Sequence, residues 1–188
     1  MIGLRIKLWP PSGLNWGGSA DEILATGFIT GKIKESGVDI LGIVLDADEA
    51  FAGRWQRIRG MCVGLFPQIP KEMPRNGLVV ENADGMRFGV WFMPDNESRG
   101  MLETFLKFLV PNNSAPVMKY ADEAMGEAHK RGAPYRECHI DKALIHTWLA
   151  WQDPPGQPLG RALTACILDP HCEHATSFVA WFKNLYQL

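Results

Sequence analysis

The stretch Leu41-Gly42-Ile43-Val44-Leu45-Asp46-Ala47-Asp48 is apolar on both faces until it ends in two carboxylates separated by one residue. A strand of this kind is usually a central strand of a parallel sheet, with helices covering it above and below. Ligands of such sheets bind outside the carboxyl ends of the strands. The stretch therefore predicts an α/β fold and places Asp46 and Asp48 at the edge where a ligand would bind.

The two carboxylates favour a divalent-metal site. Residues i and i+2 of an extended segment point the same way, so the side chains of Asp46 and Asp48 are expected to face one hard cation or a shared water shell. Magnesium keeps several waters and takes only one or two protein carboxylates, so Mg²⁺ or Mn²⁺ is the expected cofactor. The alternative is structural: Asp48 caps a helix that starts near Glu49, and Asp46 is solvated at the strand end.

Composition favours one well-buried domain. The chain has 188 residues, of which 46% are hydrophobic, enough for one core but not for a second full domain. The formal net charge is -2, with 19 basic and 21 acidic side chains. This balance excludes a basic nucleic-acid wrapper and a polyanionic tail, so nucleic acid or another phosphate-containing ligand would have to contact a local patch.

The sequence contains no targeting or membrane-spanning signal. No stretch approaches the roughly 20 apolar residues of a membrane-spanning helix, and residues 1–11 lack the apolar segment of a signal peptide. The four cysteines form no CxxC pair and do not indicate a disulfide framework. We expect a cytoplasmic protein with reduced thiols and no membrane partner. Its oligomeric state stays open.

Hydrophobic periodicity and turn residues predict the order of the elements. In chain order they are a strand over residues 2–8, a loop over 9–19, a helix over 21–35, the buried strand over 38–45, a helix over 49–65, strands over 77–81 and 86–93, and helices over about 98–109, 116–130, 140–151, 158–168 and 173–186. The spacer Asn82-Ala83-Asp84-Gly85 is typical of a hairpin loop, which makes the last two strands antiparallel. We expect a single domain over 1–188: a small, mostly parallel sheet flanked by helices within 1–110, with a helical extension over 111–188 packed on it.

Two further carboxylates are candidates for an acidic cluster. Asp95 follows the strand over 86–93, and Glu103 lies in the helix after it. If that strand neighbours the buried strand, Asp95 adds a metal ligand or Glu103 a catalytic carboxylate, as phosphoryl-transfer sites with two metals require. The alternative is that Asp95 is a turn residue after a proline and that Glu103 pairs with Arg99, one helical turn earlier.

A basic stripe lies on the helix over 140–151. His139, Lys142 and His146 fall at i, i+3 and i+7 on one helix face. The histidines are roughly 10 Å apart, too far to share one ion. The stripe suits a phosphate, with Lys142 as a point charge and His146 as a hydrogen-bond donor or proton carrier. The alternative is a solvated helix face.

Two other groups of residues are weaker candidates. Trp148 and Trp151 could stack bases, although core packing is the preferred interpretation of both. Four soft-ligand residues lie close together in the sequence, but their spacing fits no zinc finger or ribbon, so zinc is not expected. These four are Cys166, His171, Cys172 and His174.

Several strings together resemble a known family. They are Gly42-Ile43-Val44-Leu45-Asp46-Ala47-Asp48 with Arg54-Trp55, Gly89-Val90-Trp91-Phe92-Met93-Pro94-Asp95-Asn96, Gly100-Met101-Leu102-Glu103, Lys142-Ala143-Leu144-Ile145-His146-Thr147-Trp148-Leu149-Ala150-Trp151-Gln152, Gly160 and Trp181. The family is an uncharacterised, mainly bacterial domain of unknown function. It is similar to the TOPRIM domains of topoisomerases, primases and overcoming-lysogenization-defect nucleases. The resemblance covers nearly the whole chain and implies a TOPRIM-like fold.

The resemblance also implies a metal site, and this chain departs from the family pattern at one point. TOPRIM-like domains bind a divalent metal through an Asp-x-Asp at a strand end, which Asp46 and Asp48 match. They also use an early glutamate in a Val-Glu-Gly segment, and no Glu-Gly follows an apolar strand upstream of Asp46. Glu22 lies inside a predicted helix and is a poor substitute. Either the first strand and helix are missing from this chain, or its start was assigned late.

The first functional hypothesis is Mg²⁺-dependent phosphoryl transfer, most naturally phosphodiester cleavage in a nucleic acid. Asp46 and Asp48 would hold the metal, which polarises the phosphoryl oxygen and helps to generate the attacking hydroxide. Glu103 or Asp95 would complete the metal shell. Lys142 or His146 would meet the phosphate.

Two alternatives come from other classes. The chain could be a non-catalytic TOPRIM-like module that acts through a partner protein, which the absent early glutamate favours. It could also be a haloacid-dehalogenase-like phosphatase, which likewise has an Asp-x-Asp after an apolar strand. That class usually places Thr or Val two residues after the second Asp, where this chain has Ala50, and its strand normally lies at the N-terminus. It ranks last.

Overall fold

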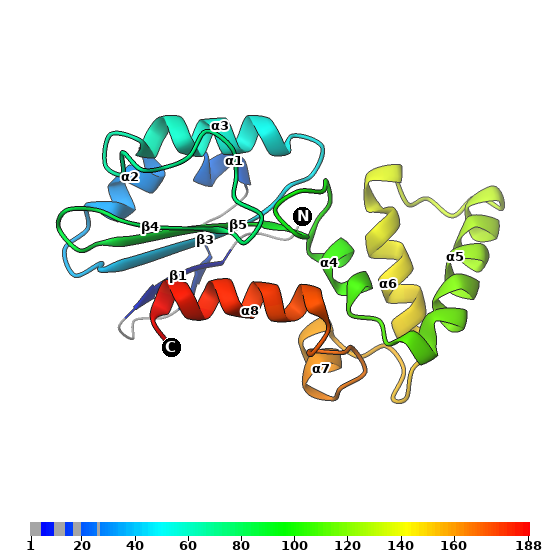
Figure 1. Cartoon of the computed structure of the whole chain (residues 1–188). Coiled ribbons are helices and arrows are strands. Elements are labelled where there is room, and N and C mark those ends of the chain that lie inside the picture. Colours follow the sequence, from blue (N-terminus) through cyan, green and yellow to red (C-terminus); the bar gives the residue numbers. More distant parts are fainter. Residues whose placement is uncertain (1–4, 10–13, 17–19, 26) are drawn as a thin grey trace. The chain divides into compact units, whose positions relative to one another are not determined.

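The structure is a computed structural model that describes residues 5–9, 14–16, 20–25 and 27–188, with side chains from residue 20 onward (Figure 1). The chain divides into two units. The sheet unit contains residues 1–102 and 177–188, and the helical unit contains residues 103–176.

The sheet unit is an α/β structure, as predicted. Its five strands are arranged in the order β2-β1-β3-β5-β4. In chain order its elements are β1 (Arg5–Trp9), β2 (Leu14–Trp16), α1 (Ala20–Ile23), α2 (Phe28–Ile33), β3 (Ile40–Asp46), α3 (Phe51–Cys62), β4 (Leu78–Glu81), β5 (Arg87–Met93) and the larger part of α8 (Glu173–Tyr186).

The sheet is mixed, so the prediction of a mostly parallel sheet is wrong. β3 and β5 run parallel along their whole length, from Ile40 opposite Arg87 to Asp46 opposite Met93. The other pairings among the described strands, β1 with β2, β1 with β3 and β4 with β5, are antiparallel. The predicted hairpin of β4 and β5 is confirmed, and its short turn can join only antiparallel strands.

Two predicted elements before β3 are corrected. The predicted loop over 9–19 contains β2, which pairs with β1; residues 10–13 and 17–19 of that loop, and 2–4 of the predicted first strand, lie outside the described residues. The predicted helix over 21–35 is two short helices, α1 and α2. Gly27 separates them with φ 90°, a left-handed backbone that glycine adopts readily and that an α-helix cannot continue through.

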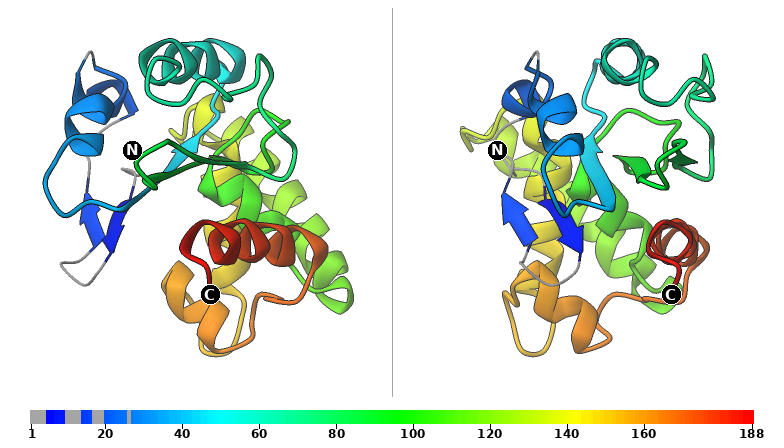
Figure 2. Two further views of the ribbon diagram at one scale, coloured as in Figure 1. Left: turned by 60° about the vertical axis from the view of Figure 1, so that its left-hand side comes forward. Right: turned by 90° about the vertical axis from the view of Figure 1, so that its left-hand side faces the viewer.

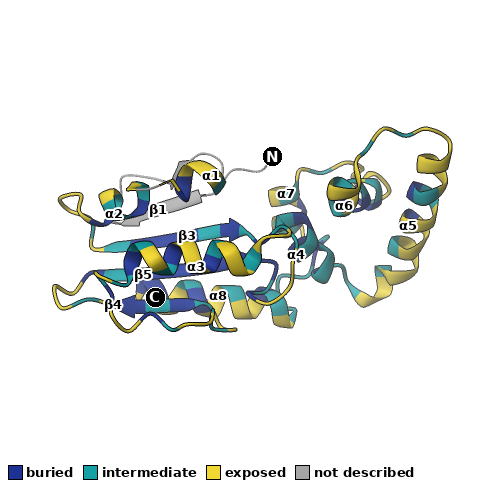
Figure 3. Cartoon of the chain, turned by 90° about the horizontal axis from the view of Figure 1, so that it is seen from above, coloured by how far each residue is buried: buried dark blue, intermediate teal, exposed yellow. Residues whose placement is uncertain are grey.

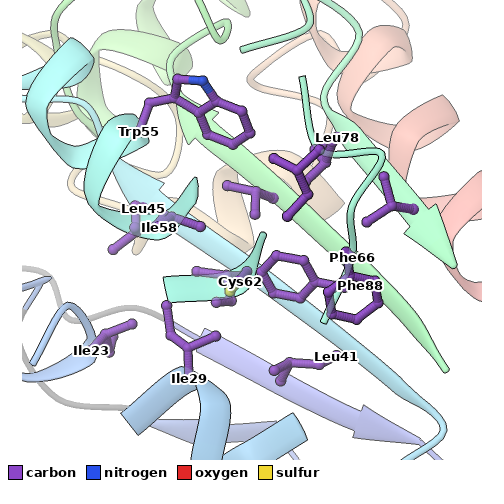
Figure 4. Packing of buried hydrophobic residues seen from close by; sticks show 14 of the residues in the cluster. Ile23, Ile29, Leu41, Leu45, Trp55, Ile58, Cys62, Phe66, Leu78 and Phe88 are labelled. Atoms are coloured by element: carbon purple, nitrogen blue, oxygen red, sulfur yellow. The ribbon is translucent and has the colours of Figure 1, made fainter. Parts of the chain in front are cut away.

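One face of the sheet packs against α1, α2 and α3. Strand alternation turns Leu41, Ile43 and Leu45 of β3 toward this face, where they are buried. α3 meets them with Trp55, Ile58 and Cys62, which fall on one helix face. Figure 4 shows Leu41, Leu45 and the three α3 side chains meeting in one apolar cluster with Phe66 and Phe88. Burial raises the pKa of the Cys62 thiol to about 12, which keeps it protonated and unreactive.

The other face of the sheet packs against α8 (Figure 1; Figure 2). A Cβ placed on Gly42 or Gly89 would lie 2.8 or 2.6 Å from Leu185 Cδ2, so these glycines let the helix approach the strands closely. The ring of Trp181 packs against that of Trp91 at a tilt of 47°, with the ring centroids 5.6 Å apart, and its indole N–H donates to the Leu78 carbonyl at 2.8 Å. The β3–β5 pair is therefore covered by helices on both faces.

The helical unit holds the remaining elements. They are α4 (Leu102–Phe108, from its second residue), the 3-10 turn η1 (Asn112–Ser114), α5 (Ala115–Lys130), the 3-10 turn η2 (Glu137–His139), α6 (Ile140–Ala150), α7 (Leu159–Thr164) and the start of α8. α5 buries Ala121 and Met125 and exposes most of its other residues (Figure 3). Trp148 is buried and donates to Ser114 Oγ at 3.0 Å, as core packing predicts. Trp151 is exposed, so that interpretation is wrong for it.

No helix among the described residues is long and apolar enough to cross a membrane.

Replacing Gly89 with alanine is expected to lower the free energy of unfolding by about 1–3 kcal/mol, because the new methyl group overpacks Leu185. The matched control is Gly53→Ala on the exposed part of α3, where an added Cβ meets open space. That change should raise stability by up to about 1 kcal/mol, since alanine favours the helix. Urea unfolding measures both. An unchanged Gly89→Ala protein would show that α8 does not pack on the sheet this closely.

Candidate functional site

The carboxyl ends of β3 and β5 lie side by side at one edge of the sheet. Their parallel register puts Asp46 opposite Met93, and the next residue, Ala47, donates its N–H to the Met93 carbonyl at 3.0 Å. The strand before Asp95 is thus the neighbour of the strand that ends at Asp46, as the acidic-cluster hypothesis requires. This edge is where parallel strands in α/β proteins place their ligands.

Asp46 is half-buried and holds together the segments around it. Its Oδ1 accepts the backbone N–H of Leu102, the first residue of α4, at 2.9 Å. Its backbone carbonyl accepts a hydrogen bond from Arg54 Nη1. The carboxylate therefore orients the start of α4, a structural role that the sequence alone did not indicate.

Asp48 lies just beyond the strand, in a left-handed backbone conformation with φ 46°. The extended geometry ends at Asp46, so strand alternation does not align the two carboxylates as the sequence suggested. Asp48 donates its N–H to the Gly100 carbonyl at 2.8 Å, and its Oδ2 lies 2.7 Å from Arg54 Nη2. Its side chain is 42% exposed. Aspartate, like asparagine, adopts the left-handed region more readily than most residues.

Asp48 does not cap the following helix, so the structural alternative proposed for it is wrong. The N-cap of α3 is Ala50, and no side chain caps it. The Asp48 carboxylate pairs with Arg54 in the first turn of α3 instead.

Asp95 organises the turn after β5. Its Oδ1 accepts the backbone N–H groups of Glu97 and Ser98 at 3.0 and 2.7 Å, and its Oδ2 accepts the Ser98 hydroxyl at 3.0 Å. These bonds are those of an Asx-type turn residue, which was the alternative reading of Asp95.

Asn96 is a residue of this edge that sequence reasoning missed. It is 1% exposed and left-handed, with φ 64°. Its Oδ1 accepts the Phe92 N–H at 2.7 Å, and its Nδ2 donates to the Arg75 carbonyl at 3.0 Å. Asparagine tolerates the left-handed region better than most residues, so the Pro-Asp-Asn string was the available signal. Asn96 fixes the turn that carries Asp95.

Glu103 belongs to the helical unit and is 1% exposed. Lys142 Nζ lies 3.6 Å from its Oε1, beyond hydrogen-bonding distance, and neither carboxylate oxygen has a hydrogen-bond partner among the described residues. Arg99, the partner suggested by the sequence, pairs with Glu49 at 2.8 Å. The structure thus brings Glu103 and Lys142 together as a buried carboxylate with one neighbouring ammonium.

The rest of the basic stripe is dispersed along α6 and before it. His146 is exposed, and His139 Nε2 lies 3.3 Å from Arg136 Nη2. Beside Lys142, Asp141 accepts hydrogen bonds from the Thr104 hydroxyl and Lys107 Nζ, both at 2.5 Å. Lys142 is therefore part of a charged contact between α4 and α6.

Two carboxylates lie at the sheet edge, and each has an internal partner, the Leu102 N–H for Asp46 and Arg54 for Asp48. Asp46 and Asp48 offer hard carboxylate oxygens, and Asp48 is accessible to solvent. Among the described residues, no group of three or more His, Cys, Asp or Glu side chains is placed to hold a metal. Hard carboxylate oxygens are the kind of ligand that Mg²⁺ takes, and Mg²⁺ commonly binds through one or two protein carboxylates.

The chain belongs to the family described as "Protein of unknown function (DUF3226)", whose model matches residues 12–187. The prediction of an uncharacterised domain family is therefore confirmed. No curated protein matches the chain, and no solved structure matches it.

Lys142→Met is expected to lower the free energy of unfolding by about 3 kcal/mol, because it leaves the Glu103 carboxylate buried without its cation. Adding Glu103→Gln should recover part of this loss. The matched control, Lys107→Met, should cost about 1 kcal/mol or less, since Asp141 keeps the Thr104 hydroxyl. Chemical unfolding measures all three. Equal losses for Lys142→Met and Lys107→Met would contradict a special role of the Glu103–Lys142 pair.

Proposed function

We propose that the chain is a TOPRIM-like protein that performs Mg²⁺- or Mn²⁺-dependent phosphoryl transfer, with a phosphodiester bond of nucleic acid as the substrate. The observation that carries the proposal is the position of Asp46 and Asp48 at the carboxyl end of a central strand, beside the parallel end of β5. Support also comes from the solvent exposure of Asp48.

In this proposal Asp46 and Asp48 would hold the cation, with Asp95 as a further candidate ligand. A bound cation would supply charge that polarises a phosphoryl oxygen and helps to generate the attacking hydroxide. The chain's own contribution is positional. The Leu102 N–H holds the Asp46 carboxylate, the Gly100 carbonyl holds the Asp48 backbone, and Asn96 holds the turn that carries Asp95.

Glu103, Lys142 and His146 are proposed for proton transfer and phosphate binding. Glu103 and Lys142 would act as a pair, because the ammonium lies against the buried carboxylate. His146 is exposed on α6, and an accessible imidazole suits a proton carrier.

A second candidate function is a non-catalytic module that acts through a partner protein. The observation that favours it is that the Asp46 carboxylate and the Asp48 carboxylate both have internal partners, Leu102 N–H and Arg54. In that case the Asp-x-Asp serves to hold the loops at the sheet edge.

Titration with Mn²⁺ by calorimetry separates the two candidates. The wild-type chain is expected to bind Mn²⁺, and Asp46→Asn/Asp48→Asn to bind it at least about tenfold more weakly, because both anionic ligands are removed. The matched control is Asp84→Asn, which removes a carboxylate from the exposed β4–β5 turn and should leave the affinity unchanged. Binding that is absent in wild type, or equal in the double variant, would contradict the metal site.

Incubation with labelled DNA and RNA, with Mn²⁺ or with a chelator, tests the reaction itself. Metal-dependent products that Asp46→Asn/Asp48→Asn does not form are expected. No products would favour the partner-binding module. Release of phosphate from an aryl phosphate without cleavage of nucleic acid would instead indicate a phosphatase.

A further inference from the structure

We propose that Arg54 is the resident counter-ion of Asp48, and that a divalent cation binds Asp46 and Asp48 by displacing the Arg54 guanidinium from Asp48. The inference rests on the proposed cation site and adds a competing side chain to it. Arg54 is then a positioning residue that sets the affinity of the site for its metal.

The guanidinium is fixed by two contacts to the two residues of the proposed site. Arg54 Nη2 lies 2.7 Å from Asp48 Oδ2, and Arg54 Nη1 donates to the backbone carbonyl of Asp46. The planar fork of a guanidinium makes such paired contacts with little loss of freedom, which a lysine cannot reproduce. The Arg54 side chain is only 16% exposed, so water screens this ion pair less than it screens a pair at the open surface.

A cation that approaches Asp48 therefore meets a carboxylate that is already neutralised. The cation and the guanidinium compete for the same oxygen, and their like charges repel at short range. A cation that binds only those molecules in which Asp48 is not paired with Arg54 has an apparent affinity that is lowered in proportion to the fraction of such molecules. While Arg54 holds Asp48, the Asp-x-Asp is a weaker metal site than its two carboxylates alone would make.

Glu49, the residue after Asp48 in the chain, forms a separate ion pair. Arg99 pairs with Glu49 at 2.8 Å, and both side chains are exposed. Removing the Arg99 charge therefore leaves the Asp48–Arg54 pair in place, so Arg99→Gln is a matched control for a general change in net charge.

The experiment is Mn²⁺ calorimetry on the full chain at low ionic strength, with circular dichroism as the check on folding. Arg54→Gln is expected to bind Mn²⁺ at least about tenfold more tightly than wild type, as for a site whose competent fraction is about one tenth. Arg99→Gln should stay within about twofold of wild type, because the exposed Arg99 charge pairs with Glu49 and is screened by solvent. Adding Asp46→Asn and Asp48→Asn to Arg54→Gln should remove the gain, which assigns it to this site.

The outcomes separate the two proposals. If wild type binds Mn²⁺ and Arg54→Gln binds it equally or more weakly, the inference is overturned and the proposed metal site stands. If neither protein binds Mn²⁺, the metal site is wrong and the inference falls with it. Should Arg54→Gln fail to fold, Arg54→Lys takes its place: the ammonium keeps the charge but lacks the fork, so a smaller gain in affinity is expected, and no gain overturns the inference.

Discussion

The parallel pairing of β3 with β5 is the constraint on which the rest of this structure depends. The two strands are paired from Ile40 and Arg87 to Asp46 and Met93, and helices cover them on both faces. Covering both faces requires apolar side chains on both, with glycine where α8 comes closest. The first polar side chain that can face water along β3 is therefore at its carboxyl end. That is why Asp46 and Asp48 stand where they do.

The same pairing brings the loops after both strands to one edge, where polar side chains hold them. Asp46 binds the start of α4, Asp48 binds Arg54 of α3, and Asn96 fixes the turn after β5. Two of these residues, Asp48 and Asn96, have left-handed backbones. Hydrogen bonds and an ion pair within the edge hold both residues in place. In the account proposed here, the guanidinium of Arg54 competes with a cation for the Asp48 carboxylate.

The sequence predicted the elements with strong periodicity and missed those that depend on contacts far along the chain. β3, the hairpin of β4 and β5, and the main helices follow from apolar patterns and turn residues. The mixed character of the sheet could not be predicted, because pairing direction at β1 depends on tertiary contacts rather than on the strand's own residues. In the sequence, Gly27 indicated only a residue that favours a helix weakly, and not the break between two helices. Trp151 shows the same limit. Helical spacing predicts on which face of α6 a residue lies, but it does not predict whether another element covers that face.

For the site, the sequence located the Asp-x-Asp at a strand end but not the partners of the two carboxylates. Arg54 lies one helical turn into α3, and its contact with Asp48 depends on the left-handed turn between strand and helix. The sequence predicted that the Glu103 carboxylate lies in a helix, whereas its burial beside Lys142 depends on how α4 packs against α6. Motifs thus indicated the chemistry, while packing decided which charges neutralise each other.

Anomalous diffraction from crystals grown with Mn²⁺ tests the central claim most directly. The expected result is an anomalous peak within coordination distance of the Asp46 and Asp48 carboxylates, with the Arg54 guanidinium moved away from Asp48. A map with no peak at this edge and with the Asp48–Arg54 ion pair intact at saturating Mn²⁺ would contradict the account.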